Sequence, residues 1–247
     1  MRSTLRFLPP TLAFALLFAV AGRAADVEPA ANMLTEKEKA DGWKLLFDGK
    51  STNGWHMYKG KEVGDQWKAV HGALTLSHKD GKHGGDIVTD ESFDNFELSI
   101  EWKVTKGANS GIMYRVSETE ESPYMTGPEY QILDNAGHED GKHKETSAAS
   151  CYALYAPSED LTKPIGEWNH ARIIVNGNHV EHWLNGKKVV EYEFGSDDWK
   201  KRVANSKFNE WKKFGTFKKG GIDLQDHGDD VAYRNIKIRA LGDKPGK

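Results

Sequence analysis

The sequence contains almost no cysteine, no large excess of charge and no second long apolar run after its N-terminus. Among 247 residues the single cysteine, Cys151, excludes an intramolecular disulfide, so stability must come from packing. Apolar neighbours predict that this thiol is buried and not catalytic. With 34 basic and 37 acidic side chains the formal net charge is −3, which gives no electrostatic basis for binding nucleic acid or an acidic membrane.

The N-terminus has the pattern of an export signal. Arg2 and Arg6 precede an apolar stretch at residues 7–20, and small residues follow to Ala24. This arrangement is typical of a cleavable secretory signal peptide and is short for a membrane span. No cysteine follows the expected cleavage region, so a lipid anchor is not indicated. We expect an exported protein, periplasmic or secreted, that has no membrane contact after cleavage.

The remaining chain predicts one domain that is rich in short strands. We assign residues 1–24 to the signal peptide, 25–33 to a linker and 34–242 to a single domain. Residues 96–103 alternate apolar and polar side chains, which indicates a strand with one buried face. Asn-Gly pairs at 176–177 and 185–186 predict an antiparallel meander.

The order of these segments favours an all-β fold. About a dozen short strands, without a repeating strand–helix alternation, predict a two-sheet antiparallel β-sandwich with short helical insertions. A strand is also predicted at residues 152–155. Helices are predicted at residues 34–40, capped by Thr35, and at residues 197–214, capped by Ser196 or Asp197, with Ser206 as a second cap at which the helix can restart. The second helix is expected as an insertion at a sheet edge.

Two strand-like segments carry polar side chains that a purely structural strand does not need. In residues 127–134, Glu129 and Gln131 share one face, and in residues 221–227, Asp223, Gln225 and His227 share one face if the strand continues. We interpret the two segments as walls of one polar cleft. Carboxylates, carboxamides and an imidazole suit the hydroxyl groups of a sugar. Most of the eight tryptophans are expected in the core.

With these residues in view, the chain resembles the 3-keto-disaccharide hydrolase domain family, long catalogued as a bacterial domain of unknown function. Six blocks in order over most of the mature chain carry the resemblance: residues 42–49 with Gly54-Trp55, 109–115, 127–134 with His138, 167–169, 182–186, and 221–228 with 233–236. The resemblance implies a concanavalin A-like, jelly-roll sandwich.

The resemblance also implies an activity. Such enzymes cleave glycosides whose glucose unit has first been oxidised at C3 by a separate sugar 3-dehydrogenase. A ketone at C3 acidifies the hydrogen on C2, so a base can remove it and the group on C1 leaves by elimination; added water then completes a net hydrolysis. The chemistry needs a base near C2, stabilisation of the enolate oxygen and a proton for the leaving oxygen.

On this basis we assign catalytic roles to three residues. Glu129 is the predicted acid/base, because a carboxylate on the groove face of a strand can have its pKa raised by desolvation. His138 is the predicted second proton-transfer group or a metal ligand, oriented by Asp134. The alternatives are that Glu129 only binds hydroxyls or a cation, and that His138 is an ordinary surface side chain.

A further set of residues is predicted to bind the substrate. Arg115 is expected to clamp hydroxyls or stabilise an enolate, or else to form a structural ion pair with Glu129 or Asp134. The other predicted substrate-binding residues are Asn109, Gln131, Tyr155, Gln225 and His227. For Tyr155 a core position, and for His227 a loop-stabilising role, are the alternatives.

No cofactor is assigned. A divalent ion is compatible with the residues between Asp134 and His143, and calcium with the carboxylates of Asp226, Asp229 and Asp230, but no spaced metal signature is present and no ligand is named. Two other functions stay open. One is a non-catalytic, lectin-like carbohydrate-binding domain. The other is a laminarinase-type glycosidase, which the chain departs from at Gln131 and Asp134.

Overall fold

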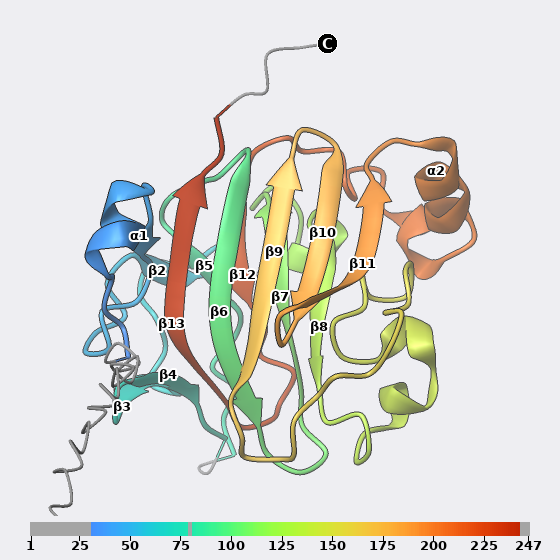
Figure 1. The fold of residues 1–247 in the computed structure, drawn as a ribbon. Coiled ribbons are helices and arrows are strands. Elements are labelled where there is room, and N and C mark those ends of the chain that lie inside the picture. The colour runs from blue at the N-terminus through green and yellow to red at the C-terminus, as the bar shows by residue number, and fades with distance from the viewer. Residues whose placement is uncertain (1–30, 79–80, 243–247) are drawn as a thin grey trace, which may run out of the picture.

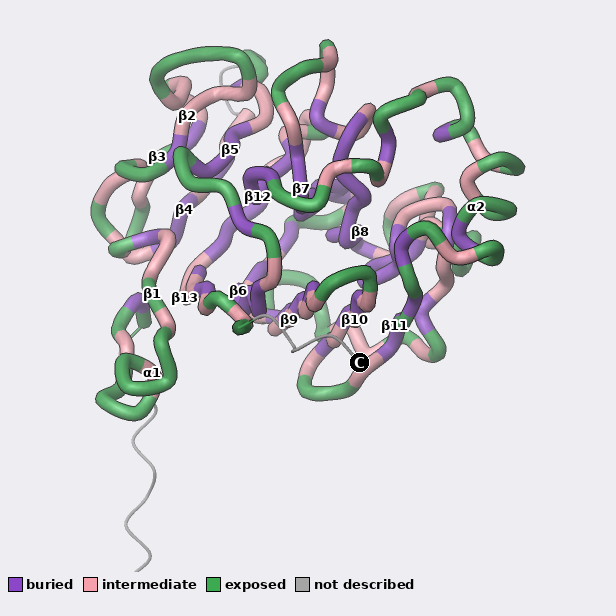
Figure 2. The backbone as a smooth tube through the Cα atoms, turned by 90° about the horizontal axis from the view of Figure 1, so that it is seen from above, coloured by how far each residue is buried: buried purple, intermediate pink, exposed green. Residues whose placement is uncertain are grey.

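The computed structural model describes residues 31–78 and 81–242, and the predicted signal peptide lies outside these residues, as does most of the predicted linker. Two antiparallel sheets pack face to face, and short helices flank them (Figure 1). The predicted two-sheet antiparallel sandwich of the jelly-roll class is therefore confirmed. Seen from above, the buried residues concentrate in the two layers and the exposed ones in the surrounding loops (Figure 2).

The larger sheet has the strand order β11-β10-β9-β6-β13-β4-β3, and β1 pairs with β13. Its strands are β1 (Lys44–Leu45), β3 (Trp67–Val70), β4 (Ala73–Leu76), β6 (Phe96–Val104), β9 (Asn169–Asn176), β10 (His179–Leu184), β11 (Lys187–Glu193) and β13 (Val231–Ala240). The strand predicted at residues 96–103 is confirmed as β6, and the predicted meander as β9 to β11. Asn185 and Gly186 both have positive φ, as a tight two-residue hairpin turn requires.

The smaller sheet carries the polar strands. Its order is β2-β5-β12-β7-β8. Its strands are β2 (Trp55–Met57), β5 (Ile87–Thr89), β7 (Asn109–Val116), β8 (Glu129–Leu133) and β12 (Gly221–Leu224). The apolar residues of one face, among them Ile112, Tyr114 and Ile132, enter the core between the sheets. The opposite face is therefore left for the polar residues that alternate with them.

A fully hydrogen-bonded polar group lies inside the core between the sheets. Tyr114 Oη contacts His182 Nε2 at 2.7 Å and Tyr192 Oη at 2.6 Å, and His182 Nδ1 lies 3.0 Å from the carbonyl oxygen of Ala149. Burial lowers the pKa of His182 to about 4, so the ring is neutral. Cys151 is buried in the same core, as predicted, and burial raises the pKa of its thiol to about 12.

The helical elements are short. They are α1 (Glu36–Ala40), α2 (Asp197–Ala204) and the 3-10 turns η1 (Pro123–Met125), η2 (Glu139–Lys142), η3 (Lys144–Thr146) and η4 (Lys207–Glu210). Thr35 caps α1 as predicted. The helix predicted at 197–214 is interrupted: α2 ends at Ala204, and Ser206 caps Phe208 and starts the separate turn η4, in agreement with the predicted restart at Ser206. The second part is a 3-10 turn that ends at Glu210, so the predicted helix is too long. The α2–η4 segment follows the edge strand β11, as expected (Figure 1).

The strand predicted at residues 152–155 is also wrong. This segment forms a turn with two isolated bridges, one between Cys151 and Tyr130 and one between Cys151 and Tyr155. Ala153 has a φ of 56°, a left-handed conformation that departs from regular extended backbone. Within residues 31–78 and 81–242, no helix is both long enough and apolar enough to cross a membrane.

Candidate active site

The register of the smaller sheet places its polar side chains side by side on the outer face. Met113 of β7 pairs with Glu129 of β8 on one side and with Asp223 of β12 on the other. Gly111 pairs with Gln131, and its carbonyl accepts a hydrogen bond from the backbone of Gln225. Segments almost 100 residues apart in sequence thus become neighbouring rows of one surface.

These rows form part of a pocket with a volume of about 140 Å³. The walls come from β7, η1, β8, the turn after β8 that carries Tyr152, η4 and the segment after β12. The lining residues are Asn109, Tyr124, Glu129, Gln131, Tyr152, Lys207, Phe208, Gln225 and His227. The predicted polar cleft therefore exists, and it contains five of the predicted site residues. Tyr124, Tyr152, Lys207 and Phe208 were not predicted.

Glu129 is the central titratable group of the pocket. Its side chain lies over Gly111, where a Cβ atom would overlap the Glu129 carboxylate, so glycine at position 111 makes the room that this carboxylate occupies. Burial raises the pKa of Glu129 to about 8. The positive charge of Lys207 lowers this pKa, whereas the negative charges of Asp86 and Asp140 raise it. A carboxyl with a pKa near neutrality can exchange protons in both directions.

A second buried carboxyl lies close enough to Glu129 to interact with its charge. Asp223 is fully buried, and neither of its oxygens has a hydrogen-bond partner among the described residues. Burial raises the pKa of Asp223 well above its usual range, and Asp86 and Glu129 contribute further. Burial likewise raises the pKa of Asp86 to about 6. Glu129, Asp223 and Asp86 therefore form a group of carboxyls that resist ionisation together, and only Glu129 lines the pocket.

A cation faces these carboxyls from the inserted segment. Lys207 Nζ lies 4.5 Å from the ring centroid of Tyr152 and 5.5 Å from that of Phe208. Tyr152 Oη donates to Asp140 Oδ2 at 3.2 Å. In the sequence, Lys207 lies among several other lysines between residues 200 and 213, and no local signal distinguishes it from them.

The amide side chains of the pocket leave acceptors for a ligand. Gln131 Nε2 donates to the carbonyl of Thr146 at 3.2 Å, while Gln131 Oε1 and Gln225 Oε1 have no hydrogen-bond partner among the described residues. The same holds for Asn109 Oδ1. Buried acceptors without partners are costly in a resting protein, so their presence around a pocket indicates a ligand that donates hydrogen bonds. Sugar hydroxyls have this property.

His138 and Asp134 lie outside the pocket lining. The carboxylate of Asp134 accepts hydrogen bonds from the backbone of Gly107 and Ala136, at 2.7 and 3.1 Å. His138 Nδ1 accepts from the backbone of Asp140 at 3.1 Å. The prediction that Asp134 orients the His138 ring is therefore wrong, because both groups are used by their own loop. The His138 ring centroid lies 6.3 Å from that of His227, which does line the pocket.

Arg115 is also placed elsewhere. A register shift between β7 and β12 and a φ of 55° at Arg115 indicate a bulge that changes the direction of this side chain. Nη2 of the guanidinium donates to the carbonyl oxygen of Gly177 at 2.8 Å and lies 3.4 Å from Asp94 Oδ1. Arg115 thus connects the surrounding loops and does not line the pocket. The alternative of a structural ion pair holds in kind, but the partner is Asp94 and not Glu129 or Asp134.

Tyr155 belongs to the aromatic packing of the insertion. Its ring stacks on Tyr192 with centroids 4.8 Å apart, and the Arg202 guanidinium lies 4.4 Å from its centroid. The side chain is absent from the pocket lining, which agrees with the alternative that placed it in the core.

The carboxylates that suggested a cation site are largely used by the backbone. Asp229 accepts from the backbone of Asn109 at 3.0 Å, and Asp230 from that of His78 at 2.7 Å. Within the described ranges, two groups have enough nearby ligand atoms for a metal ion. His179, Glu181 and Glu191 form one, on the meander, where Lys188 pairs with both glutamates. His78, His83 and Asp226 form the other.

Comparison with known proteins gives a consistent set of relatives. A family model described as the 3-keto-alpha-glucoside-1,2-lyase-like domain matches residues 42–239. A protein of Bacteroides thetaiotaomicron named 3-keto-disaccharide hydrolase is 37% identical over 230 residues, covering 82% of this chain and 79% of its own.

Solved structures agree in fold. A candidate glycosyl hydrolase from Parabacteroides distasonis is 36% identical, with a TM-score of 0.79, over 86% of this chain and 100% of its own. A second such structure from the same organism is 28% identical, with a TM-score of 0.61, over 81% of this chain and 99% of its own. The matched region includes every strand that contributes to the pocket.

Proposed function

The chain belongs to the 3-keto-alpha-glucoside-1,2-lyase-like domain family, and from that premise we propose that it cleaves 3-keto-glycosides, in particular 3-keto-disaccharides. Family membership makes it a hydrolase acting on glycosidic bonds. The proposal concerns the oxidised substrate, the chemistry and the residues. It requires a separate dehydrogenase that oxidises the sugar at C3 beforehand, and export of the protein to the compartment where that sugar occurs.

The observation that carries the proposal is a buried glutamate with a pKa of about 8 beside a lysine in a pocket lined by unpaired amide oxygens. Glu129 in its ionised form takes the proton from C2 of the keto sugar. The electrons of that C–H bond form an enolate whose negative charge is on the oxygen at C3. Return of these electrons expels the group on C1, whose oxygen takes up a proton, and water then adds across the new double bond.

Lys207 stabilises the enolate oxygen in this scheme. Its side chain lines the pocket from the insertion, and its positive charge offsets the negative charge that develops on the enolate oxygen. Gln131, Gln225 and Asn109 bind the hydroxyl groups that fix the orientation of the ring. His227, on the exposed side of the pocket, is positioned to contact the leaving group.

The laminarinase alternative loses support from the position of Asp134. A classical retaining enzyme needs two carboxylates on either side of the bond that is cleaved, about 5 Å apart. Asp134 lines a different pocket, together with Asn135 and Asp160, and its oxygens bind backbone N–H groups.

The proposal is tested by incubating the protein without its signal peptide with a 3-keto-disaccharide, and with the unoxidised parent, in D₂O. Release of a free sugar from the keto substrate alone, with deuterium at C2 of the product beyond that of an enzyme-free control, is the expected result. Release without deuterium would contradict the elimination step. Turnover of the parent would indicate an ordinary glycosidase, and saturable binding of either sugar without turnover would indicate a lectin.

A further inference from the structure

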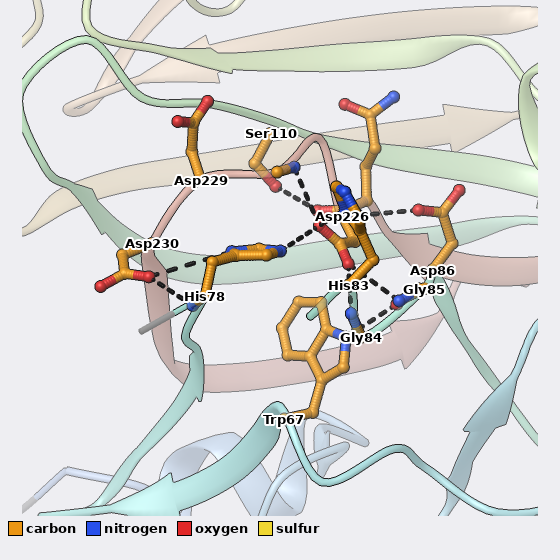
Figure 3. A network of polar contacts seen from close by, with 12 residues as sticks. Trp67, His78, His83, Gly84, Gly85, Asp86, Ser110, Asp226, Asp229 and Asp230 are labelled. Atoms are coloured by element: carbon orange, nitrogen blue, oxygen red, sulfur yellow. Dashed lines mark hydrogen bonds and ion pairs between the residues drawn. The ribbon is translucent and has the colours of Figure 1, made fainter. Parts of the chain in front are cut away.

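Two histidines and an aspartate converge outside the pocket, where the loop after β4 meets the loop between β12 and β13 (Figure 3). His78 Nε2 lies 2.7 Å from Asp226 Oδ1, and His83 Nδ1 lies 3.9 Å from the same oxygen. One ligand atom from each of the three residues lies within 4.8 Å of the others. Pocket residues are not members of this group, although Gln225 and His227 flank Asp226 in sequence.

Asp226 is held rigidly in place. Its side chain is 1% exposed. Oδ2 accepts from the backbone of Gly84 and Gly85 at 2.6 and 2.8 Å (Figure 3). Oδ1 accepts from the backbone of Gly228 at 2.9 Å. Of the lone pairs on Oδ1, one therefore faces Gly228 and the other faces the His78 ring. A carboxylate fixed in this way is pre-organised to bind a cation in the second direction.

The His78 ring has one nitrogen that the resting contacts leave unpaired. Nε2 faces Asp226, whereas the buried Nδ1 has no hydrogen-bond partner among the described residues. A carboxylate of Asp230 lies 3.9 Å from that nitrogen. If Nε2 binds a metal, the ring proton moves to Nδ1 and a small rotation lets it donate to Asp230. This carboxylate–histidine–metal arrangement is common around protein-bound metals.

We propose that His78, His83 and Asp226 bind one divalent transition-metal ion, of the class that includes Zn²⁺ and Co²⁺. Two imidazoles and one carboxylate suit such ions, whereas Ca²⁺ prefers oxygen ligands alone. Bonds of about 2.0–2.2 Å in a tetrahedral site separate ligand atoms by roughly 3.3 Å, which lies between the two nitrogen–oxygen distances in the structure. Because the His83 side chain is 77% exposed, a fourth position is open to water.

Such an ion replaces the proton between His78 and Asp226 and leaves the three backbone hydrogen bonds of Asp226 intact. It ties the loop after β4 to the segment that carries Gln225 and His227. Its role is therefore to hold one wall of the pocket, at a distance from the reacting atoms. This inference is independent of the substrate proposed above.

The test is a titration of the chelator-treated, signal-less protein with Co²⁺, followed by calorimetry and by the visible absorption of bound cobalt. We expect one equivalent to bind. The His83→Ala variant should bind at least about tenfold more weakly, because one of three ligands is lost while the exposed side chain contributes little to folding. His143→Ala, which removes another exposed histidine, is the matched control and should bind like the wild type.

Three outcomes would overturn the inference. The first is the absence of saturable binding at about 1 mM free Co²⁺ or Zn²⁺. The second is equal affinity of the wild type and His83→Ala. The third is preferential binding of Ca²⁺, which would indicate a site of oxygen ligands. None of these readouts uses a sugar, so failure here leaves the proposed function untouched, and the reverse also holds.

Discussion

Two buried polar groups of this protein differ in whether their hydrogen bonds are complete. In the core, Tyr114, His182 and Tyr192 satisfy one another and the carbonyl of Ala149. On the outer face of the smaller sheet, Asp223 and the amide oxygens near Glu129 have no such partners among the described residues. Burial is similar in the two places, but only the second group retains an unused capacity to bind. Unsatisfied polar atoms beside a pocket therefore mark function more clearly than burial does.

The largest expected effect, and the strongest test of this comparison, comes from removing the carboxyl group of Glu129. Glu129→Gln keeps the size and removes the proton exchange, so kcat on a 3-keto-disaccharide should fall about a thousandfold while the thermal midpoint stays close to that of the wild type. Steady-state kinetics and thermal unfolding measure the two quantities. The exposed Glu139→Gln is the matched control, and an active, well-folded Glu129→Gln variant would remove this residue from the mechanism.

The pH profile should follow the ionisation of the same group. Burial raises the pKa of Glu129 to about 8, so its ionised form is lost as the pH falls through that value. Because the base must be ionised, kcat/KM should decrease about tenfold per pH unit below 8 and level off above it. The apparent pKa belongs to Glu129 together with Asp86 and Asp223. An activity that increases toward pH 6 would contradict the base role.

Lys207 is expected to act both on the intermediate and on Glu129. Lys207→Met should reduce kcat/KM about 10- to 100-fold, because the enolate loses its cation. Lys207 also lowers the pKa of Glu129, so the acidic limb of the pH profile should move to higher pH. Lys212→Met, an exposed change in the same lysine-rich region, should do neither. If kcat/KM falls but the acidic limb of the pH profile stays at the same pH, Lys207 has only a structural role.

Gln225 should affect binding more than chemistry. Its Oε1 lies buried without a partner, ready to accept from a hydroxyl. Gln225→Ala should raise KM about tenfold and change kcat less, because the hydrogen bond exists in both the bound substrate and the transition state. A reduced kcat with unchanged KM would contradict this role.

The smallest effects concern stability and compare the two groups directly. Tyr114→Phe removes a hydroxyl that serves His182 and Tyr192, so it should destabilise the fold by about 1–3 kcal/mol. Asp223→Asn should instead stabilise the protein at pH 7. Because the pKa of Asp223 is raised in the folded protein, the unfolded chain loses a proton that the folded chain keeps. This difference lowers the free energy of unfolding of the wild type. The effect is absent below pH 3.8 and increases as the pH rises above it. Denaturant unfolding at pH 5 and pH 8 measures both variants.

Much of the fold was predictable, because it depends on local patterns. Residues 96–103 alternate strictly, and Asn185-Gly186 specifies a tight turn, so β6 and the meander could be located from sequence alone. Segments without such a pattern were less predictable. Residues 152–155 look strand-like, but Cys151 forms one bridge with Tyr130 of β8 and one with Tyr155 of the same segment, so the chain turns back. Ser206 was recognised as a restart point, but the sequence pattern did not show that the part after it is only a short 3-10 turn.

The residues of the candidate site also differ in whether a local sequence pattern predicts them. Glu129, Gln131 and Gln225 were identified because polar groups at alternate strand positions are unusual enough to be informative. Arg115 was misplaced because a bulge changes its direction, and Lys207 was missed because nothing near it in sequence distinguishes it from a surface lysine.

The sequence by itself determined the strands, the turns and the polar face of β8 and β12, because each of these features depends on residues that are neighbours along the chain. Only the tertiary structure decided that Glu129 lies over Gly111, that Lys207 reaches the same pocket from an insertion, and that His78, His83 and Asp226 converge. Desolvation and Coulomb interactions act through space, so the pKa of Glu129 depends on groups that folding alone brings together.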